Sequence, residues 1–203
     1  MMKSVVIFIS GNGSNLQKLI DTINNSIIKI ELVVSNRKKA YGLERAKIHD
    51  IPTLYFPYLR KKMDRIEYDL ELANRVKTLV PKIDFIFCLG WMHVLSKEFI
   101  NSFPEKTLIN LHPALPGQFP GKDAITEAFN YYKKHPKKIM NTGAMIHYVI
   151  PEIDAGEVID TINIPIYTTD TLDTLRYRVQ FSEKELLLRA IQEVVKNSFP
   201  THQ

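Results

Sequence analysis

Short apolar runs alternate with amphipathic stretches from the start of this chain, and this alternation limits the folds open to it. The run Val5–Ile9 is apolar on both faces and ends in a glycine-rich turn, which is typical of a buried parallel strand. From Ser14 or Asn15 as N-cap, apolar residues keep helical spacing as far as Ile27, and a second apolar run follows at Ile30–Val34. These segments form one predicted βαβ unit.

The same alternation continues along the chain. We expect further strands at 53–56, 84–89, 107–111, 143–150 and 158–166. We expect helices at 42–48, 65–80, 124–132 and 171–195, and a short helix capped by Ser96. This order predicts an α/β fold with an open, mostly parallel sheet, in which ligands bind beyond the carboxyl ends of the strands.

Composition fits one compact domain. The chain has 203 residues, of which 45% are hydrophobic and 24% are charged, as in ordinary globular proteins. The net charge of +5 and the isoelectric point of about 9.1 would suit a nucleic acid, a membrane surface or an anionic small molecule. Because the basic residues are scattered in short groups, we interpret them as solvated faces and expect no nucleic acid partner.

Two features bear on the compartment. The single cysteine, Cys88, excludes an internal disulfide and a cysteine-rich zinc site, and its apolar neighbours indicate a buried structural thiol. The run Val5–Ile9 is too short for a secretory signal, and no long apolar span follows it. We therefore expect a cytoplasmic protein that does not enter a membrane.

The turn after the first strand is the first candidate site. In Ser10–Asn15, glycines permit close backbone approach, and the amides of the next helix suit a phosphate. The third glycine of a dinucleotide fingerprint would fall at Leu16, and the Gly-Lys-Ser/Thr of a nucleotide triphosphate loop is missing. The alternative is a plain strand-to-helix turn.

Other strand ends carry aromatic and polar groups. The segment Gly90–Leu95 would form a wall for a flat ring, and a packed core edge explains its residues nearly as well. Asn110 and His112 are two residues apart, so on a strand their side chains leave the same face before Pro113 ends the strand. A later loop adds Asp154. The alternative is structural capping by Asn110 and a satisfied histidine at His112, with the Asp154 loop as a plain surface turn.

An amide, an imidazole and a carboxylate together support acyl transfer without a protein nucleophile. Asn110 and a protonated His112 would hydrogen-bond the oxyanion that forms when an amine attacks a carbonyl carbon. Asp154 would favour the charged imidazole and orient it, and the imidazole would relay protons to the leaving nitrogen. Metal-dependent hydrolysis is not indicated, because the chain has no H-x-x-x-H or H-E-x-x-H motif.

Several stretches are similar to those of one enzyme family. They are Ile9–Gln17, Ser35–Arg37, Gly42–Ala46, Asn110–Pro113, Pro120–Gly121, Gly143–His147 and Ile153–Gly156. Together they resemble the phosphoribosylglycinamide formyltransferase family over nearly the whole chain. The resemblance implies a Rossmann-like fold, with a twisted, mostly parallel sheet flanked by helices. It also implies transfer of a formyl group from 10-formyltetrahydrofolate to the amine of glycinamide ribonucleotide in purine synthesis.

The resemblance assigns roles residue by residue. It implies that Asn110, His112 and Asp154 are catalytic and that His147 supports them. It implies that Gly13, Ser14, Asn15 and Glu183 bind the ribonucleotide and its phosphate. The folate-binding positions would be Arg65, Met92, His93, Val94, Leu95, Asn110, Ile150, Pro151, Glu152, Ile153 and Asp154. A phosphate-binding half at about 1–100 and a folate-binding, catalytic half at about 101–203 would form a single domain, as a monomer or weak homodimer without a metal.

Three positions depart from the family pattern. Ala114–Gly117 stands where Ser-Leu-Leu-Pro is common, His93 stands where an arginine is common, and Tyr131–Lys138 is a lysine-rich insertion. Methionyl-tRNA formyltransferase and formyltetrahydrofolate deformylase have similar motifs, but each typically adds a domain for which 203 residues leave no room. A non-catalytic binding module on the same fold is the remaining alternative.

Overall fold

The protein is described by a computed structural model that covers residues 2–59, 61, 63–135 and 141–198. The chain divides into two compact units. The first holds residues up to Asn110 together with Val149–Pro151, and the second holds Leu111–Tyr148 and the chain from Glu152 onward. Each unit is described by itself below. The single domain and its division at about residue 100 stay predictions.

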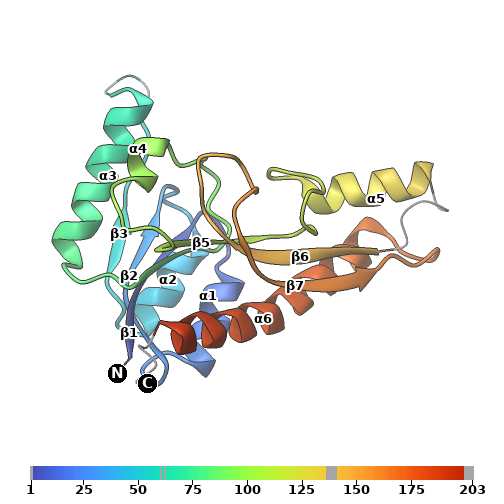
Figure 1. The fold of residues 1–203 in the computed structure, drawn as a ribbon, viewed down its shortest axis with the longest axis horizontal. Coiled ribbons are helices and arrows are strands. Elements are labelled where there is room, and N and C mark those ends of the chain that lie inside the picture. Colours follow the sequence, from blue (N-terminus) through green and yellow to red (C-terminus); the bar gives the residue numbers. More distant parts are fainter. Residues whose placement is uncertain (1, 60, 62, 136–140, 199–203) are drawn as a thin grey trace. The chain divides into compact units, whose positions relative to one another are not determined.

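The strands of the described residues form a sheet with the order β3-β2-β1-β4-β5-β6-β7 (Figure 1). They are β1 (Lys3–Ile9), β2 (Ile28–Ser35), β3 (Thr53–Tyr55), β4 (Phe85–Cys88), β5 (Leu108–His112), β6 (Asn141–Tyr148) and β7 (Val158–Pro165). The pairs β1–β2, β1–β4, β2–β3 and β4–β5 are parallel, whereas β6–β7 is antiparallel. The predicted α/β fold with a mostly parallel sheet is confirmed.

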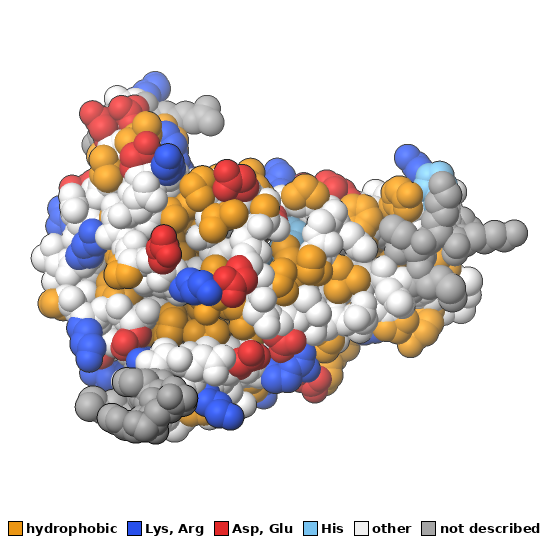
Figure 2. Space-filling view, viewed as in Figure 1, with side chains coloured by type: hydrophobic (Ala, Val, Ile, Leu, Met, Phe, Trp, Pro, Cys, Tyr) orange, Lys and Arg blue, Asp and Glu red, His pale blue; other side chains and the backbone are white. Residues whose placement is uncertain are grey.

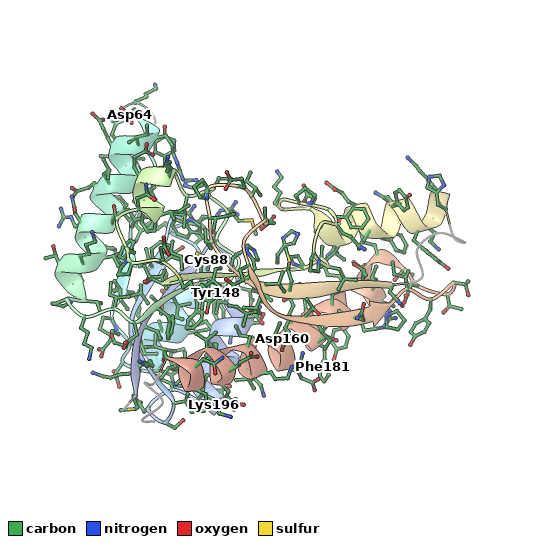
Figure 3. All side chains as sticks on the ribbon, viewed as in Figure 1. Asp64, Cys88, Tyr148, Asp160, Phe181 and Lys196 are labelled. Carbon is green, nitrogen blue, oxygen red and sulfur yellow. The ribbon has the colours of Figure 1, made fainter. Side chains whose placement is uncertain are left out.

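The helices begin and end close to the predicted bounds. They are α1 (Ser14–Thr22), α2 (Tyr41–Ile48), α3 (Arg65–Leu79), α4 (Lys97–Ile100), α5 (Ala124–Lys134) and α6 (Leu172–Asn197). Ser96 caps α4 as predicted, because its hydroxyl accepts from the Phe99 amide at 3.2 Å. Asp64, labelled in Figure 3, caps α3 with a reciprocal capping box to Glu67.

The first helix differs from the prediction at both ends. Its N-cap is Gly13 rather than Ser14 or Asn15, and the helix ends at Thr22 instead of continuing to Ile27. Asn25 has a φ of 59°, a left-handed conformation that a helix cannot continue through. Ile23 and Ile27 keep the apolar spacing of the helix but lie in the turn that follows it. The Ile27 amide donates to the Ile23 carbonyl at 3.0 Å and closes this turn.

The structure also shifts one predicted strand and places part of the predicted insertion. The strand predicted at 143–150 is β6, which begins at Asn141 and ends at Tyr148. The lysine-rich insertion Tyr131–Lys138 falls partly in the last turn of α5, and its residues 136–138 lie outside the described part of the chain.

The core of the first unit packs α3 and α4 against one face of the parallel strands (Figure 1). Alternate residues of β1, Val6 and Phe8, enter this cluster together with Cys88 of β4. Burial raises the pKa of the Cys88 thiol to about 12, and its position among the strands is visible in Figure 3. The predicted buried thiol is confirmed.

The core of the second unit joins α5, β7 and α6. Its buried members are Tyr132, Ile164, Ile166, Leu175 and Val179. The apolar stripe predicted for the terminal helix therefore packs against a strand and a helix of the same unit.

The surface distribution of charged side chains and the shortness of the apolar segments were both predicted from the sequence. On the face shown in Figure 2, Lys and Arg side chains lie singly or in small groups among Asp and Glu. Within the described ranges, no helix is both long enough and apolar enough to cross a membrane.

Candidate functional site

The turn after β1 presents the start of α1. Gly13 is the N-cap, with a φ of 75°, and as a glycine it has no side chain to occupy the helix end. The first intrahelical bond runs from the Gln17 amide to the Gly13 carbonyl at 2.9 Å. Since the first amides of a helix have no acceptor within it, this end of α1 suits an anion.

Ser10 joins this turn to the segment that follows β4. Its buried hydroxyl donates to Asn36 Oδ1 at 2.7 Å and accepts from the Met92 amide at 2.9 Å. The Ser10 amide also donates to the Gly90 carbonyl at 3.1 Å. A hydroxyl has one proton, so Ser10 donates only to Asn36, and its oxygen accepts from the Met92 amide. The predicted phosphate turn and the predicted folate wall are therefore held together within the first unit.

The segment Gly90–Leu95 is partly core and partly exposed wall. The Trp91 ring packs on Phe8 with centroids 4.9 Å apart, and Leu95 is buried. Met92 and Val94, in contrast, are 48% and 61% exposed. The core-edge interpretation therefore holds for Trp91 and Leu95, whereas a wall for a flat ring at Met92 and Val94 stays a prediction.

Arg65 and His93 are brought together in the first unit. Arg65 Nη1 lies 2.8 Å from His93 Nδ1, and Arg65 Nη2 donates to the Val94 carbonyl. Arg65 Nη2 is also 3.2 Å from Oδ1 of the buried Asp69. Burial, together with the charge of Arg65, lowers the pKa of His93. Because an arginine can only donate, His93 Nδ1 accepts from Arg65 Nη1. The departure from the family's usual arginine at position 93 did not suggest this contact.

His112 lies at the end of β5 and is almost fully buried. Its Nε2 is 3.0 Å from the Phe119 carbonyl, and its Nδ1 is 3.3 Å from Asp154 Oδ2. A carbonyl can only accept, so Nε2 carries a proton and donates. The predicted meeting of His112 and Asp154 is found in the structure.

Asp154 is shared by a second histidine. His147 Nε2 lies 3.5 Å from Asp154 Oδ1, while His147 Nδ1 donates to the carbonyl of Tyr148 at 2.9 Å. Figure 3 labels Tyr148 at the end of β6. The Gly121 amide donates to Asp154 Oδ2 at 2.9 Å. The carboxylate thus has a backbone amide and two imidazoles around it.

The two titrating groups of this cluster shift in the same direction. Burial lowers the pKa of His112, although the Asp154 carboxylate and the Phe119 carbonyl act to raise it. Burial would raise the pKa of Asp154, but hydrogen bonds from His147 and Gly121 and the charge of His112 lower it. The carboxylate does favour the charged His112 ring, as expected, but burial outweighs it.

Backbone geometry places Asp154 in the cluster. Asp154 has a φ of 52°, a left-handed conformation that is costly for a residue with a side chain. Two residues later, a Cβ added to Gly156 would lie 1.8 Å from the Tyr148 carbonyl oxygen, so only glycine fits there. The Asp-x-Gly motif is therefore a loop that aims one carboxylate.

Sequence reasoning missed two backbone partners in this unit. The Phe119 carbonyl and the Gly121 amide contact His112 and Asp154, although no role was predicted for either residue. The Pro120–Gly121 pair was the available signal, because it marks a tight turn, and Gly121 has a φ of 96°.

The remaining predicted residues are not part of the contacts described above. Asn110 is half-buried on β5, and Glu183 is buried on α6. Ile150, Pro151, Glu152 and Ile153 are exposed. Within the residues that the structure describes, no group of three or more His, Cys, Asp or Glu side chains could hold a metal ion. The predicted absence of a metal stays a prediction.

Two histidines near the ends of β5 and β6 and a carboxylate from the following loop stand on this mostly parallel α/β sheet. The sheet is that of a formyl transferase: the sequence profile of that family matches residues 3–191, and the chain belongs to the family. It is 45% identical over 204 residues to the phosphoribosylglycinamide formyltransferase of Dictyostelium discoideum, covering 95% of this chain and 98% of the relative. It is 41% identical over 212 residues to the phosphoribosylglycinamide formyltransferase of Schizosaccharomyces pombe, covering 98% of this chain and 100% of the relative.

Solved structures show the same fold. The crystal structure of phosphoribosylglycinamide formyltransferase from Bacillus halodurans superposes with a TM-score of 0.87 at 28% identity, covering 98% of this chain and 99% of that one. The predicted Rossmann-like formyltransferase fold is thereby confirmed.

Proposed function

We propose that this protein transfers the formyl group of 10-formyltetrahydrofolate to the amine of glycinamide ribonucleotide, a step of purine biosynthesis. The observation that carries the proposal is the Asp154 carboxylate, which contacts both His112 and His147 in a buried cluster. The names and the near-complete coverage of the relatives support the choice of substrates.

The proposed reaction needs no covalent enzyme intermediate. The neutral substrate amine attacks the formyl carbon, and the formyl oxygen takes up negative charge. Protonated His112 and the Asn110 amide hydrogen-bond that oxygen. Asn110 and His112 leave the same face of β5, because they are two residues apart on one strand. A proton then moves from the attacking nitrogen to N10 of the folate, and the bond between N10 and the formyl carbon breaks.

Charge in the cluster supports these roles. A neutral His112 ring has one proton, and Nε2 uses it on the Phe119 carbonyl. Asp154 opposes the effect of burial and makes protonation of Nδ1 less unfavourable. The oxyanion then replaces the Phe119 carbonyl as the partner of His112. The segment that carries Phe119 therefore has to give way before reaction.

Substrate binding is assigned to named groups. Gly13, Ser14 and Asn15 bind the ribonucleotide phosphate through backbone amides, and Glu183 contacts the same substrate. The folate contacts Arg65, Met92–Leu95 and Ile150–Asp154. The protein acts in the cytoplasm as a monomer or weak homodimer, without a metal, membrane or nucleic acid.

A substrate-dependence assay tests the proposal. Purified protein should consume 10-formyltetrahydrofolate only when glycinamide ribonucleotide is present, with one formylated amine formed per tetrahydrofolate released. Release of tetrahydrofolate with water alone would assign a deformylase instead. Binding of both compounds without turnover would identify a non-catalytic module.

A further inference from the structure

Two stretches that resemble the family, Ser35–Arg37 and Gly42–Ala46, have no role in the proposed function. The structure places both against the phosphate turn. Asn36 accepts from Ser10 at the start of the turn, as described above. Arg45, on α2, makes the more extensive contacts.

The guanidinium of Arg45 bonds to residues on both sides of Gly13–Asn15. Its Nε donates to the Asn12 carbonyl at 2.9 Å, and its Nη2 donates to Asn12 Oδ1 at 3.0 Å. Its Nη1 donates to Gln17 Oε1 at 3.1 Å. Each of the three nitrogens thus has an acceptor, and the planar fork fixes their relative directions. A lysine could not reproduce this arrangement.

Packing holds the guanidinium from another side. The Arg45 Cζ atom lies 4.8 Å from the centre of the Tyr41 ring, within the range of a cation–π contact. Tyr41 begins α2, so a single helix carries both Arg45 and the ring that holds it.

The backbones of α2 and the turn also approach each other closely. The Gly42 amide donates to the Gly11 carbonyl at 3.2 Å. A Cβ added to Gly13 would lie 2.6 Å from Gly42 Cα, closer than Cβ atoms come to other atoms. Two glycines therefore let α2 dock on the turn, and Arg45 fastens the docked arrangement.

Arg45 also places a positive charge beside the turn. Its three acceptors are a carbonyl and two side-chain amide oxygens, none of them charged. Arginine stays protonated in proteins. A positive charge therefore lies beside the N-terminus of α1, where the helix dipole already favours an anion. Because its donors bond to Asn12 and Gln17, Arg45 does not bind the phosphate directly. It acts on the phosphate by holding the turn in place and through the electrostatic field of its positive charge.

We propose that Arg45 is a positioning residue for the ribonucleotide phosphate: it fixes the Asn12–Gln17 backbone and strengthens the positive field at the start of α1. The inference rests on the proposed binding of phosphate by Gly13–Asn15. It assigns Gly42–Ala46 the task of presenting that turn.

The test compares Arg45→Met and Arg45→Lys with a matched control, Arg75→Met, which removes an exposed arginine of α3 that pairs with Glu71. Calorimetry measures the dissociation constant of ribose 5-phosphate, and kinetics give KM for each substrate and kcat. Arg45→Met should raise the dissociation constant and the KM for glycinamide ribonucleotide about ten- to a hundredfold. The KM for the folate should stay at the control value.

Arg45→Lys separates the fork from the charge. Lysine restores the charge but not the three fixed donors, so binding should recover only in part. Full recovery in Arg45→Lys would contradict the positioning role. An equal loss with glycinamide riboside, which lacks the phosphate, would also overturn the proposal, since the effect would not concern phosphate.

If Arg45→Met does not fold, Asn12→Ala provides a second test. It removes the side-chain oxygen that accepts from Arg45 Nη2 and should weaken ribose 5-phosphate binding by a smaller factor. Unchanged binding would contradict the proposal.

The binding and turnover results distinguish a failure of this inference from a failure of the proposed function. Wild-type protein that binds ribose 5-phosphate without formyl transfer contradicts the function but leaves the Arg45 inference testable and intact. Wild-type turnover with unaltered Arg45→Met binding contradicts only the inference. Wild-type protein that neither binds ribose 5-phosphate nor transfers the formyl group contradicts both.

Discussion

The phosphate turn and the Asp154 cluster are two polar sites built from different parts of the chain. The turn, Ser10–Asn15, offers backbone amides, and its geometry depends on a glycine with a φ of 75°. The cluster offers side chains, and its geometry depends on a half-buried carboxylate between the buried His112 and His147. One site works through backbone shape and the other through buried charge.

This difference predicts how each site fails. Adding a single carbon atom at Gly13 should damage the turn, because the backbone of Gly42 lies where the new atom would go. Removing a charge or a proton carrier damages the cluster, since its members are buried and depend on each other. Substitutions in the turn should change substrate binding, and substitutions in the cluster should change turnover.

The largest effect is expected from His112→Ala. Removal of the proposed proton carrier should lower kcat by about two to four orders of magnitude, with little change in the KM for glycinamide ribonucleotide. Steady-state kinetics on the purified variant give both values. His135→Ala is the matched control, since that histidine is exposed after α5. Near-normal turnover in His112→Ala would remove this residue from the mechanism.

A smaller loss is expected from Asp154→Asn. The amide keeps the shape of the carboxylate but loses its charge, so kcat should fall about ten- to a hundredfold. The midpoint of the His112 ring titration, followed by NMR, should move to lower pH, because the carboxylate opposes the effect of burial. Asp173→Asn, at a 91% exposed side chain of the same unit, is the control. An unmoved midpoint would show that Asp154 does not tune His112.

The same carboxylate predicts a pH dependence of stability. The pKa of Asp154 lies below its ordinary value of 3.8. Its contribution to the free energy of unfolding is therefore present above that pH and is lost as the pH falls through the folded-state pKa. Acid unfolding curves of wild type and Asp154→Asn should converge at the lowest pH and separate above it.

The smallest effect on kcat is expected from Gly13→Ala, which tests the turn. The left-handed φ and the 2.6 Å approach to Gly42 Cα should lower the free energy of unfolding by about 1–3 kcal/mol and raise the KM for glycinamide ribonucleotide. Gly11→Ala is a control within the same turn, because a Cβ there meets nothing within 4 Å. Equal effects of the two substitutions would contradict a special role for the Gly13 conformation.

Local patterns allowed much of the fold to be predicted. Apolar runs and helical spacing located each strand and helix, because these signals depend on near neighbours in sequence. The first helix was predicted five residues too long, from Thr22 to Ile27, since apolar spacing continued into a turn that the conformation of Asn25 creates. Hydrophobic period alone does not show where the backbone changes direction.

The candidate site was predictable only in part. Asn110 and His112 lie on one strand, so their shared face follows from spacing. His147 was recognised only through the resemblance, and its contact with Asp154 comes from the fold. The Phe119 carbonyl was signalled only by the neighbouring Pro120–Gly121 turn, because a backbone oxygen is common to all residues. Arg45 lies in the family-like stretch Gly42–Ala46, but no role was predicted for it, because a surface arginine is usually solvated.

By itself, the sequence determined the order of strands and helices, the glycine-rich turn after the first strand and the residue types available for formyl transfer. These depend on local period, on turn chemistry and on the identity of side chains. Only the tertiary structure decided that Asp154 is shared by His112 and His147, that burial outweighs the carboxylate at His112, and that Arg45 fastens the turn. Each of these depends on distances and burial between residues that lie far apart in the chain, and sequence spacing does not contain that information.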